Sequence, residues 1–303
     1  MTDETMPPHE PTGARPPTAA AAGRIRLGAD LTVARMGFGA MRLTGPGIWG
    51  EPADPARCRS VLRRAVDLGV ELIDTADSYG PEVSEQLIRD ALHPYPAQVV
   101  IATKGGLTRP GPGRWEPCGR PEYLRQCVEM SLRRLGLERI DLYQFHRPDP
   151  QVPLADSLGA LAELQAQGKI RSLGVSNVTA DQLAAARSVV EVVSVQNRYN
   201  LTDRSSDEVL SACEDAGTAF LPWAPVAGGE LAHPGGPIDA VASARGLSVA
   251  QLSLAWLLRR SPVMVPIPGT ADPDHLDENV AAASVELRDD DWAAVEEAAQ
   301  AAP

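Results

Sequence analysis

The chain has 303 residues, a formal net charge of -12, and 44% hydrophobic and 22% charged residues. That length allows one large domain or two ordinary ones, and the apolar fraction is sufficient for a substantial core. The acidic balance argues against nucleic acid or an anionic membrane surface as the main partner. No apolar run reaches the ~18 residues that a membrane-spanning helix needs.

The cysteines and the first residues indicate where the protein resides and where its domain begins. Cys58, Cys118, Cys127 and Cys213 form no CxxC pair and no metal-type spacing. We therefore expect reduced thiols in a cytoplasmic protein, and no metal site. Residues 1–23 are rich in Pro, Ala and Thr and lack the apolar segment of a secretory signal. They are predicted to be a disordered tail before one barrel domain of residues 24–303.

The ordered part begins with two short extended stretches and a glycine-rich loop. Arg24–Gly28 and Leu31–Phe38 predict a hairpin whose second arm continues into a first core strand. The loop Thr44–Gly50 follows and carries Trp49. A longer Gly/Pro-rich loop, Gly105–Gly119, carries Trp115.

Strands and helices then alternate along the chain. Apolar runs predict strands at Val70–Ile73, Gln98–Thr103, Ile140–Phe145, Arg171–Val175, Val192–Val195, Ala219–Leu221 and Val263–Ile267. Periodic apolar patterns with caps predict a helix from Asp54 to Leu68, and further helices at Glu82–Leu92, Pro121–Leu135, Leu154–Gln167, Ala180–Val189, Ser205–Ala216, Ile238–Arg245, Val249–Arg260, Pro273–Ala282 and Asp289–Ala299.

This order predicts the α/β class and a (β/α)8 TIM barrel with an N-terminal β-hairpin and a C-terminal helix. Eight strand–helix units in a row imply parallel strands with right-handed crossovers. Such a barrel takes roughly 250 residues. The alternative is an open doubly wound sheet. It is disfavoured because Gly37-x-Gly39 lacks a third glycine and does not open a helix.

Nearly every predicted strand ends in a polar or otherwise unusual residue. In a barrel, the carboxyl ends of the strands form one mouth, where active sites lie. The residues expected there are Gly39, Asp74 with Tyr79, Lys104, His146, Ser176 with Asn177, Gln196, Trp223, and Gly269 with Thr270.

Four of these residues form a chemically coherent set. A tyrosine hydroxyl has a pKa of ~10, and a nearby ammonium group lowers it by stabilising the tyrosinate. Asp74 is expected to pair with Lys104, and Lys104 to lower the pKa of Tyr79. His146 is expected to donate to the carbonyl oxygen that Tyr79 would protonate. The set is a general acid, and it requires a partner that delivers a hydride to the carbonyl carbon.

With these residues and their spacing, the chain resembles the aldo-keto reductase family from about Arg24 to Ala299. The matching segments are Ile73–Gly80, Ala102–Lys104, Ser131–Leu135, Asp141–Tyr143, His146, Gly168–Arg171, Gly174–Asn177, Val195–Asn197, Ile267–Thr270 and Glu278–Asn279. The resemblance implies a cytoplasmic barrel enzyme that binds NADPH across its mouth and reduces a small-molecule carbonyl substrate.

The resemblance also assigns roles to individual residues. Asp74, Tyr79, Lys104 and His146 match the catalytic tetrad. Ser176, Asn177 and Gln196 match the ligands of the nicotinamide carboxamide, and Trp223 an aromatic residue that stacks on that ring. Thr270 matches a contact to the 2′-phosphate. The remaining expected cofactor contacts are Gly39, Met41, Ala224, Pro225, Gly269 and His275, with Glu278 and Asn279 at the adenine.

Two departures from the family pattern concern the cofactor. The family often has an arginine where this chain has His275, and basic or small residues near Asp272. A carboxylate close to a phosphate is unfavourable. NADPH is therefore the expected cofactor, with the strictness of its preference over NADH left open.

The pocket loops leave the substrate open. The loop Thr44–Trp49 and the turn Gly80–Val83 are similar to those of the bacterial pyridoxal reductase subgroup, and Trp49 and Trp115 are expected to line the substrate pocket. Pyridoxal or a similar aromatic aldehyde is the first candidate. The alternatives are a keto-sugar or polyketide intermediate of a biosynthetic pathway, or a cofactor-binding regulatory subunit. The oligomeric state stays open.

Overall fold

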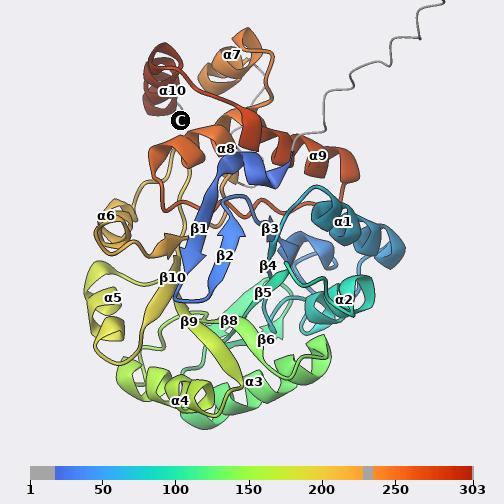
Figure 1. Cartoon of the computed structure of the whole chain (residues 1–303), viewed down its shortest axis with the longest axis vertical. Coiled ribbons are helices and arrows are strands. Elements are labelled where there is room, and N and C mark those ends of the chain that lie inside the picture. Colours follow the sequence, from blue (N-terminus) through green and yellow to red (C-terminus); the bar gives the residue numbers. More distant parts are fainter. Residues whose placement is uncertain (1–17, 228–234, 302–303) are drawn as a thin grey trace, which may run out of the picture.

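The computed structural model describes residues 18–227 and 235–301 and contains a ring of parallel strands surrounded by helices (Figure 1). One seven-stranded sheet has the order β11-β10-β9-β8-β5-β4-β3. Its strands are β3 (Phe38–Gly39), β4 (Leu72–Asp74), β5 (Val100–Gly105), β8 (Ile140–Phe145), β9 (Ile170–Ser176), β10 (Val192–Gln196) and β11 (Ala219–Phe220). The predicted α/β barrel architecture is confirmed.

The helices lie close to their predicted bounds. They are α1 (Pro55–Asp67), α2 (Val83–Leu92), α3 (Pro121–Leu135), α4 (Leu154–Ala166), α5 (Ala180–Arg187), α6 (Asp207–Ala216), α7 (Pro237–Ala244), α8 (Val249–Arg260), α9 (Pro273–Ala281) and α10 (Asp289–Ala301). Asp54 caps α1 by accepting from the Arg57 amide, and Ser248 begins α8 with a capping box. These local signals explain why the bounds could be predicted.

The ring closes through a segment that is not a regular strand. The prediction of a strand at Val263–Ile267 is wrong in this respect, because Pro266 and Pro268 have no N–H group to donate to a neighbour. The segment still runs between β11 and β3, and backbone hydrogen bonds join it to both. They are Phe220 N to Val263 O (2.8 Å), Val265 N to Phe220 O (2.8 Å), Gly37 N to Pro266 O (2.9 Å) and Gly39 N to Pro268 O (3.1 Å).

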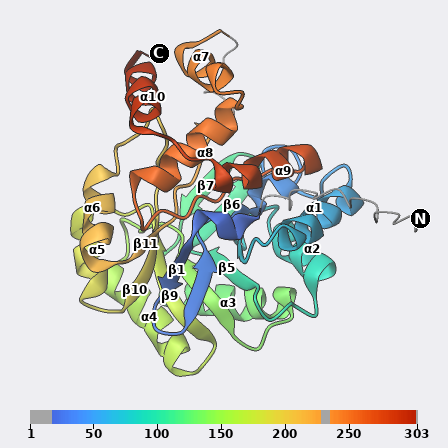
Figure 2. The ribbon, with the colours of Figure 1, turned by 45° about the horizontal axis from the view of Figure 1, so that its top comes forward.

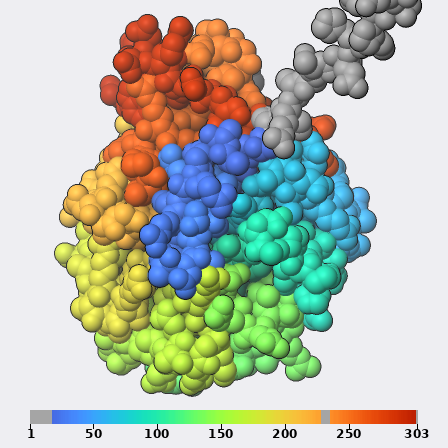
Figure 3. Space-filling model, viewed as in Figure 1, coloured from blue at the N-terminus to red at the C-terminus, as the bar shows by residue number. Residues whose placement is uncertain are grey.

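The N-terminal hairpin covers one end of the barrel. Strands β1 (Arg24–Leu27) and β2 (Leu31–Ala34) pair antiparallel, as predicted, and lie across the centre of the face seen in Figures 1 and 3. Leu27, Leu31 and Val33 are buried there against the inner side chains of the ring, which include Leu72, Val100, Leu142, Val193 and Val265. Since this end is sealed by apolar packing, the opposite end, with the carboxyl ends of the strands, is where a site can open.

Two segments differ from the predicted organisation. Ala19–Ala22, assigned above to a disordered tail, form a 3-10 helix in which Ala19 is buried and donates to the Leu68 carbonyl at 2.9 Å. A short apolar surface against α1 is enough to order them. Residues 1–17 of the expected tail lie outside the described residues. Within the long loop Gly105–Gly119, strands β6 (Leu107–Gly111) and β7 (Arg114–Pro117) form a second hairpin, which was not predicted.

Helices α7 and α10 project from the ring side by side, and α7 leads into the N-terminal end of α8 (Figure 2). Arg245 and Asp291 form an ion pair between them. No single helix in residues 18–227 and 235–301 is long and apolar enough to cross a membrane. Only α7 and α8 taken together reach that length and composition, across a bend of 87°.

Gly105, at the end of β5, has no room for a side chain. A Cβ atom there would overlap the Tyr143 hydroxyl and lie 2.9 Å from Cys127 Cβ. We expect Gly105→Ala to lower the free energy of unfolding by about 1–3 kcal/mol through overpacking. Gly159→Ala is the control, because nothing lies within 4 Å of that position in α4. Removing this helical glycine should stabilise by about 0.5–1 kcal/mol. Urea unfolding of both variants measures this, and equal shifts would contradict the packing argument.

Candidate active site

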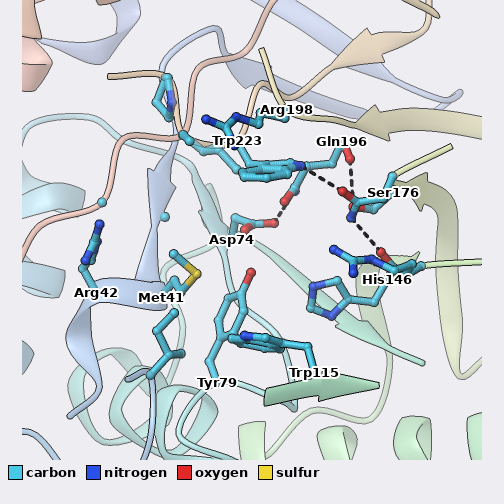
Figure 4. Close-up of a pocket in the computed structure, with 18 of the residues that line it drawn as sticks. Met41, Arg42, Asp74, Tyr79, Trp115, His146, Ser176, Gln196, Arg198 and Trp223 are labelled. Carbon is cyan, nitrogen blue, oxygen red and sulfur yellow. Dashed lines mark hydrogen bonds between the residues drawn. The ribbon is translucent and has the colours of Figure 1, made fainter. Parts of the chain in front are cut away.

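A cavity of about 420 Å³ opens at the carboxyl ends of the strands (Figure 4). Tyr79, Trp115 and His146 lie on one side of it and Trp223 on the other, with Asp74 between them (Figure 4). Of the predicted site residues, those that line the cavity are Gly39, Met41, Asp74, Tyr79, Trp115, His146, Ser176, Asn177, Gln196, Trp223, Ala224, Pro225 and Gly269. The volume is in the range of small-molecule sites.

A buried ion pair forms the base of the cavity. Strands β4 and β5 are neighbours, and this pairing places Asp74 beside Lys104. Lys104 Nζ donates to Asp74 Oδ2 at 2.7 Å and to the Thr75 carbonyl at 2.9 Å, and its side chain is 0% exposed. Burial alone lowers the pKa of Lys104, but Asp74 and Tyr79 more than offset this effect. The pKa of Lys104 therefore lies above its ordinary value.

Two amide side chains hold the second oxygen of the same carboxylate. Gln144 Nε2 donates to Asp74 Oδ1 at 3.1 Å, and Gln196 Nε2 at 2.8 Å. Gln196 was predicted as a cofactor ligand, whereas Gln144 was not predicted at all. A glutamine inside the apolar run Ile140–Phe145 is the signal that could have identified it, since a buried amide needs a partner.

The loop after β4 is tied to β5, and this holds Tyr79 over Lys104. The Thr75 amide donates to the Ala102 carbonyl at 2.8 Å, and the Asp77 amide to the Lys104 carbonyl at 3.1 Å. Tyr79 is 6% exposed, and its hydroxyl oxygen lies 3.4 Å from Lys104 Nζ. The predicted convergence of Asp74, Tyr79 and Lys104 is therefore found in the geometry.

The direction of the Tyr79 pKa shift is opposite to the expectation. Burial raises the pKa of the Tyr79 hydroxyl, and Asp74 adds to this, while Lys104 acts in the opposite direction without overcoming burial. The net pKa of Tyr79 lies above its ordinary value. The hydroxyl thus keeps its proton at neutral pH, as a proton donor must.

His146 lies beside Tyr79 and is neutral. Burial and then the positive charges of Lys104, Arg147 and Arg109 hold the pKa of His146 well below 6.5. The two ring centroids of Tyr79 and His146 are 5.9 Å apart, edge to face. His146 follows β8, where its carbonyl accepts from Asn177 Nδ2 at 3.0 Å.

A second group of polar side chains follows β9 and β10. Ser176 Oγ donates to the Gln196 carbonyl at 2.8 Å and accepts from Asn177 Nδ2 at 2.9 Å. Asn177 has φ 57°, a left-handed conformation that asparagine tolerates better than most residues. Trp223 Nε1 donates to Asn177 Oδ1 at 3.2 Å, which fixes the indole at the cavity wall.

The residues predicted to reach the far end of the cofactor lie beyond the cavity lining. Thr270 Oγ1 accepts from the Asp272 amide at 3.0 Å, and Asp272 caps α9. His275, Glu278 and Asn279 are on α9 itself. Arg57 of α1 forms an ion pair with Asp272 at 2.6 Å, a contact between distant parts of the chain that the sequence did not indicate.

The two predicted pocket tryptophans behave differently. Trp115 of β7 lines the cavity, but Trp49 does not, and its neighbour Ile48 lines it instead. Arg109 links both loops. Its guanidinium lies 3.6 Å from the Trp115 ring centroid and donates to the carbonyls of Ile48 and Ser78 at 2.9 and 2.6 Å. Arg109 therefore joins the loop that carries Ile48, the hairpin that carries Trp115 and the segment next to Tyr79.

Several lining residues were not predicted, namely Arg42, Ile48, Leu107, Arg147, Arg198, Val226, Ala227 and Ile267. Leu107 belongs to the unpredicted hairpin, and Arg147 follows His146 directly. Residues 228–234, which follow the lining residue Ala227 directly, lie outside the described residues. The structurally described residues contain no group of three His, Cys, Asp or Glu side chains that could hold a metal ion.

Removing one partner of the buried ion pair should be costly. Asp74→Ala leaves the Lys104 ammonium group buried without its counter-charge, and we expect a loss of about 3–5 kcal/mol in the free energy of unfolding. Asp277→Ala breaks an exposed pair, with Arg64 at 2.8 Å, and should cost only about 0–1 kcal/mol. Chemical denaturation compares the two, and a similar small loss for both would contradict the structure.

His146 should make stability depend on pH. The folded protein needs it neutral, whereas the unfolded chain protonates it with a pKa of ~6.5. The free energy of unfolding should therefore decrease as pH falls below about 6.5, by up to ~1.4 kcal/mol per pH unit for this one proton. His146→Gln should lose that part of the slope. Unfolding curves of the wild type and of His146→Gln at pH 5, 6 and 7.5 test this prediction. If the free energy of unfolding depends on pH in the same way in both proteins, the prediction is wrong.

Comparison with known proteins gives one family. The family model described as "Aldo/keto reductase family" matches residues 35–300. An uncharacterised oxidoreductase of Schizosaccharomyces pombe is 52% identical over 279 residues, covering 92% of this chain and 90% of that protein. Pyridoxine 4-dehydrogenase of Escherichia coli K12 is 41% identical over 266 residues, covering 86% of this chain and 92% of that protein.

A solved structure agrees with these matches. The aldo-keto reductase from Klebsiella pneumoniae in complex with NADPH has a TM-score of 0.77 and 28% identity, over 90% of this chain and 94% of that one. The family model covers most of the chain, and both curated relatives exceed 40% identity over most of its length. This chain belongs to the aldo/keto reductase family.

Proposed function

We propose that the protein is an NADPH-dependent reductase that converts an aldehyde or ketone to an alcohol, with Tyr79 as the proton donor. The observation that carries this proposal is the position of the Tyr79 hydroxyl. It lies at the cavity wall, 3.4 Å from the ammonium group of Lys104, which Asp74 fixes in place. A protonated phenol beside a buried cation is suited to protonating an oxygen that becomes negative during reaction.

The donors and acceptors along the cavity suit a nicotinamide. Asn177 Oδ1 accepts one hydrogen bond, from Trp223, and Gln196 donates through Nε2, so both side chains keep acceptor capacity for a carboxamide NH2 group. The indole of Trp223 offers a flat apolar surface to the ring. Ser176, Asn177 and Gln196 are therefore the proposed ligands of the nicotinamide carboxamide.

The region around Thr270 suits the 2′-phosphate better than the sequence suggested. The unfavourable carboxylate of Asp272 is paired with Arg57, so its charge is compensated. Thr270 supplies a hydroxyl close by. We assign these residues to the 2′-phosphate end, and Glu278 and Asn279 to the adenine, which supports NADPH as the cofactor.

Each side chain around the cavity has its own role in the proposed reaction. When bound, the nicotinamide supplies a hydride for the carbonyl carbon. Tyr79 donates its proton to the carbonyl oxygen, and neutral His146 offers a ring N–H to the same oxygen. The tyrosinate that remains is stabilised by Lys104 until a proton from solvent restores it. Trp115 and Leu107 exclude water from one side.

Pyridoxal or a similar aromatic aldehyde is the first substrate to test. The likeness to pyridoxine 4-dehydrogenase supports this choice, as does the aromatic wall formed by Trp115 and Tyr79, whose ring centroids are 6.2 Å apart. A planar substrate packs well against such a wall.

Tyr79→Phe separates binding from chemistry. The variant loses the proton donor but keeps the ring, so we expect kcat to fall by about 10²–10⁴-fold. The dissociation constant of NADPH, measured by fluorescence quenching, should change little. Wild-type rates with pyridoxal and a panel of neutral aromatic aldehydes provide the reference. Full turnover by Tyr79→Phe on any of these substrates would overturn the assignment.

A further inference from the structure

The charged residues that line the cavity include more positive than negative side chains. Among the described residues that line it, Asp74 is the sole carboxylate, and Lys104 neutralises it. Three arginines line the same cavity, namely Arg42, Arg147 and Arg198. The described lining therefore carries a net positive charge in a chain whose net charge is -12, so this charge does not follow from the composition of the chain.

The three arginines differ in their partners. Arg198 forms an ion pair with Asp203 at 2.8 Å and lies over the Trp223 ring, 5.6 Å from its centroid. Within residues 18–227 and 235–301, neither Arg42 nor Arg147 has an ion-pair partner or a side-chain hydrogen bond. Two positive charges at the cavity thus have no acidic counterpart in the described part of the protein.

Arg42 lies across the cavity from His146, the residue that Arg147 follows. Figure 4 shows Arg42 with Met41 on the side opposite His146, with Tyr79 and Asp74 between them. The Arg42 side chain comes within 3.7 Å of where a Cβ on Gly269 would be, so it belongs to the side proposed for the cofactor. A cofactor with several phosphate charges accounts for Arg42.

Arg147 requires another explanation. It follows His146 directly, at the end of β8, and it lines the same cavity. Its charge is close enough to His146 to contribute to the low pKa of that imidazole. Arg147 is exposed and also lines the cavity, so its positive charge is accessible to a ligand that the cavity binds.

We propose that Arg147 binds an anionic group of the substrate, a carboxylate or a phosphate, while the carbonyl group lies at Tyr79 and His146. This inference rests on the proposed reductase function and adds to it a preference for carbonyl compounds that carry a carboxylate or phosphate over analogues that lack one, such as pyridoxal. Arginine is suited to this task because its planar guanidinium binds either anion through two parallel hydrogen bonds.

Two substrate pairs of matched shape test the proposal. One pair is 4-carboxybenzaldehyde and methyl 4-formylbenzoate, which differ by the carboxylate charge. The other is pyridoxal 5′-phosphate and 5-deoxypyridoxal, which tests a phosphate; neither of these two can close the internal hemiacetal that hides the aldehyde of pyridoxal. We expect wild-type kcat/KM to favour the anionic member of at least one pair by about tenfold to a hundredfold, since hydrogen bonds to charged groups contribute strongly. Which pair shows the preference distinguishes a carboxylate from a phosphate.

Arg147→Gln should abolish that preference mainly by raising KM for the anionic member, and Arg147→Lys should restore part of it. Arg139→Gln is the matched control, because it removes the same charge at the other end of β8 and does not line the cavity. Its preference for the anionic member should equal that of the wild type. A preference that falls equally in both glutamine variants would indicate a general field effect and refute a contact with Arg147.

The outcomes separate this inference from the proposed function. Reduction of the neutral members without preference for the anionic ones overturns the role of Arg147 and leaves the reductase intact. Loss of reduction of every carbonyl compound overturns the reductase itself. A wild-type ratio near one overturns the role of Arg147 whether or not any variant folds, whereas a preference for the anionic member is assigned to Arg147 by the comparison of the Arg147 and Arg139 variants.

Discussion

A fully buried ammonium group constrains the whole mouth of this barrel. Lys104 has no exposed side-chain surface, and burying an unpaired lysine would cost several kcal/mol. Its charge is stabilised only if Asp74 stands opposite, and Asp74 in turn is held by Gln144 and Gln196. These four side chains come from β4, β5, β8 and β10. The register of four strands and the position of the cavity base therefore depend on each other.

Burial acts on the two neighbouring titratable groups in opposite senses. It raises the pKa of Tyr79 and lowers that of His146, because in both cases the charged form is disfavoured. The wall of the cavity thus presents two neutral groups that can donate hydrogen bonds, above a cation that is already compensated. Such a site needs little reorganisation when negative charge develops on a bound oxygen. At the start of α9, beyond the cavity lining, charge is compensated differently, by an exposed ion pair between Arg57 and Asp272.

The sequence predicts features that are encoded locally and misses those that depend on tertiary pairing. Asp54 and Pro121 marked helix starts correctly, because a cap and a first-turn proline act only on nearby residues. The residues at the strand ends could be named in advance because a parallel barrel brings them to one mouth. In contrast, the partners of Arg109 and Arg57 lie in distant segments of the chain, so the local sequence around these arginines does not indicate them.

Four mismatches with the structure have physical causes that a single chain does not reveal. The segment at Val263–Ile267 has the apolar pattern of a strand, but prolines interrupt its pairing. The hairpin of β6 and β7 lies in a stretch rich in glycine and proline, where loop signals dominate. The direction of the Tyr79 pKa shift depends on how completely the ring is buried, and only the packed structure supplies that. Trp49 was assigned correctly to its loop, but the side chain that lines the cavity belongs to Ile48.

The closure of the ring has a consequence for how the protein is made. Gly37 and Gly39, near the start of the ordered chain, receive their partners from Pro266 and Pro268, close to its end. A ribosome releases the chain from the N-terminus, so strands β3 to β11 emerge before anything can join the first of them to the last. Gly39 and Gly269, which both line the cavity, are brought together only when this late segment is in place. Without it, β3 and β11 are the two unpaired edges of the sheet, so the ring cannot close before residues 263–268 have been synthesised.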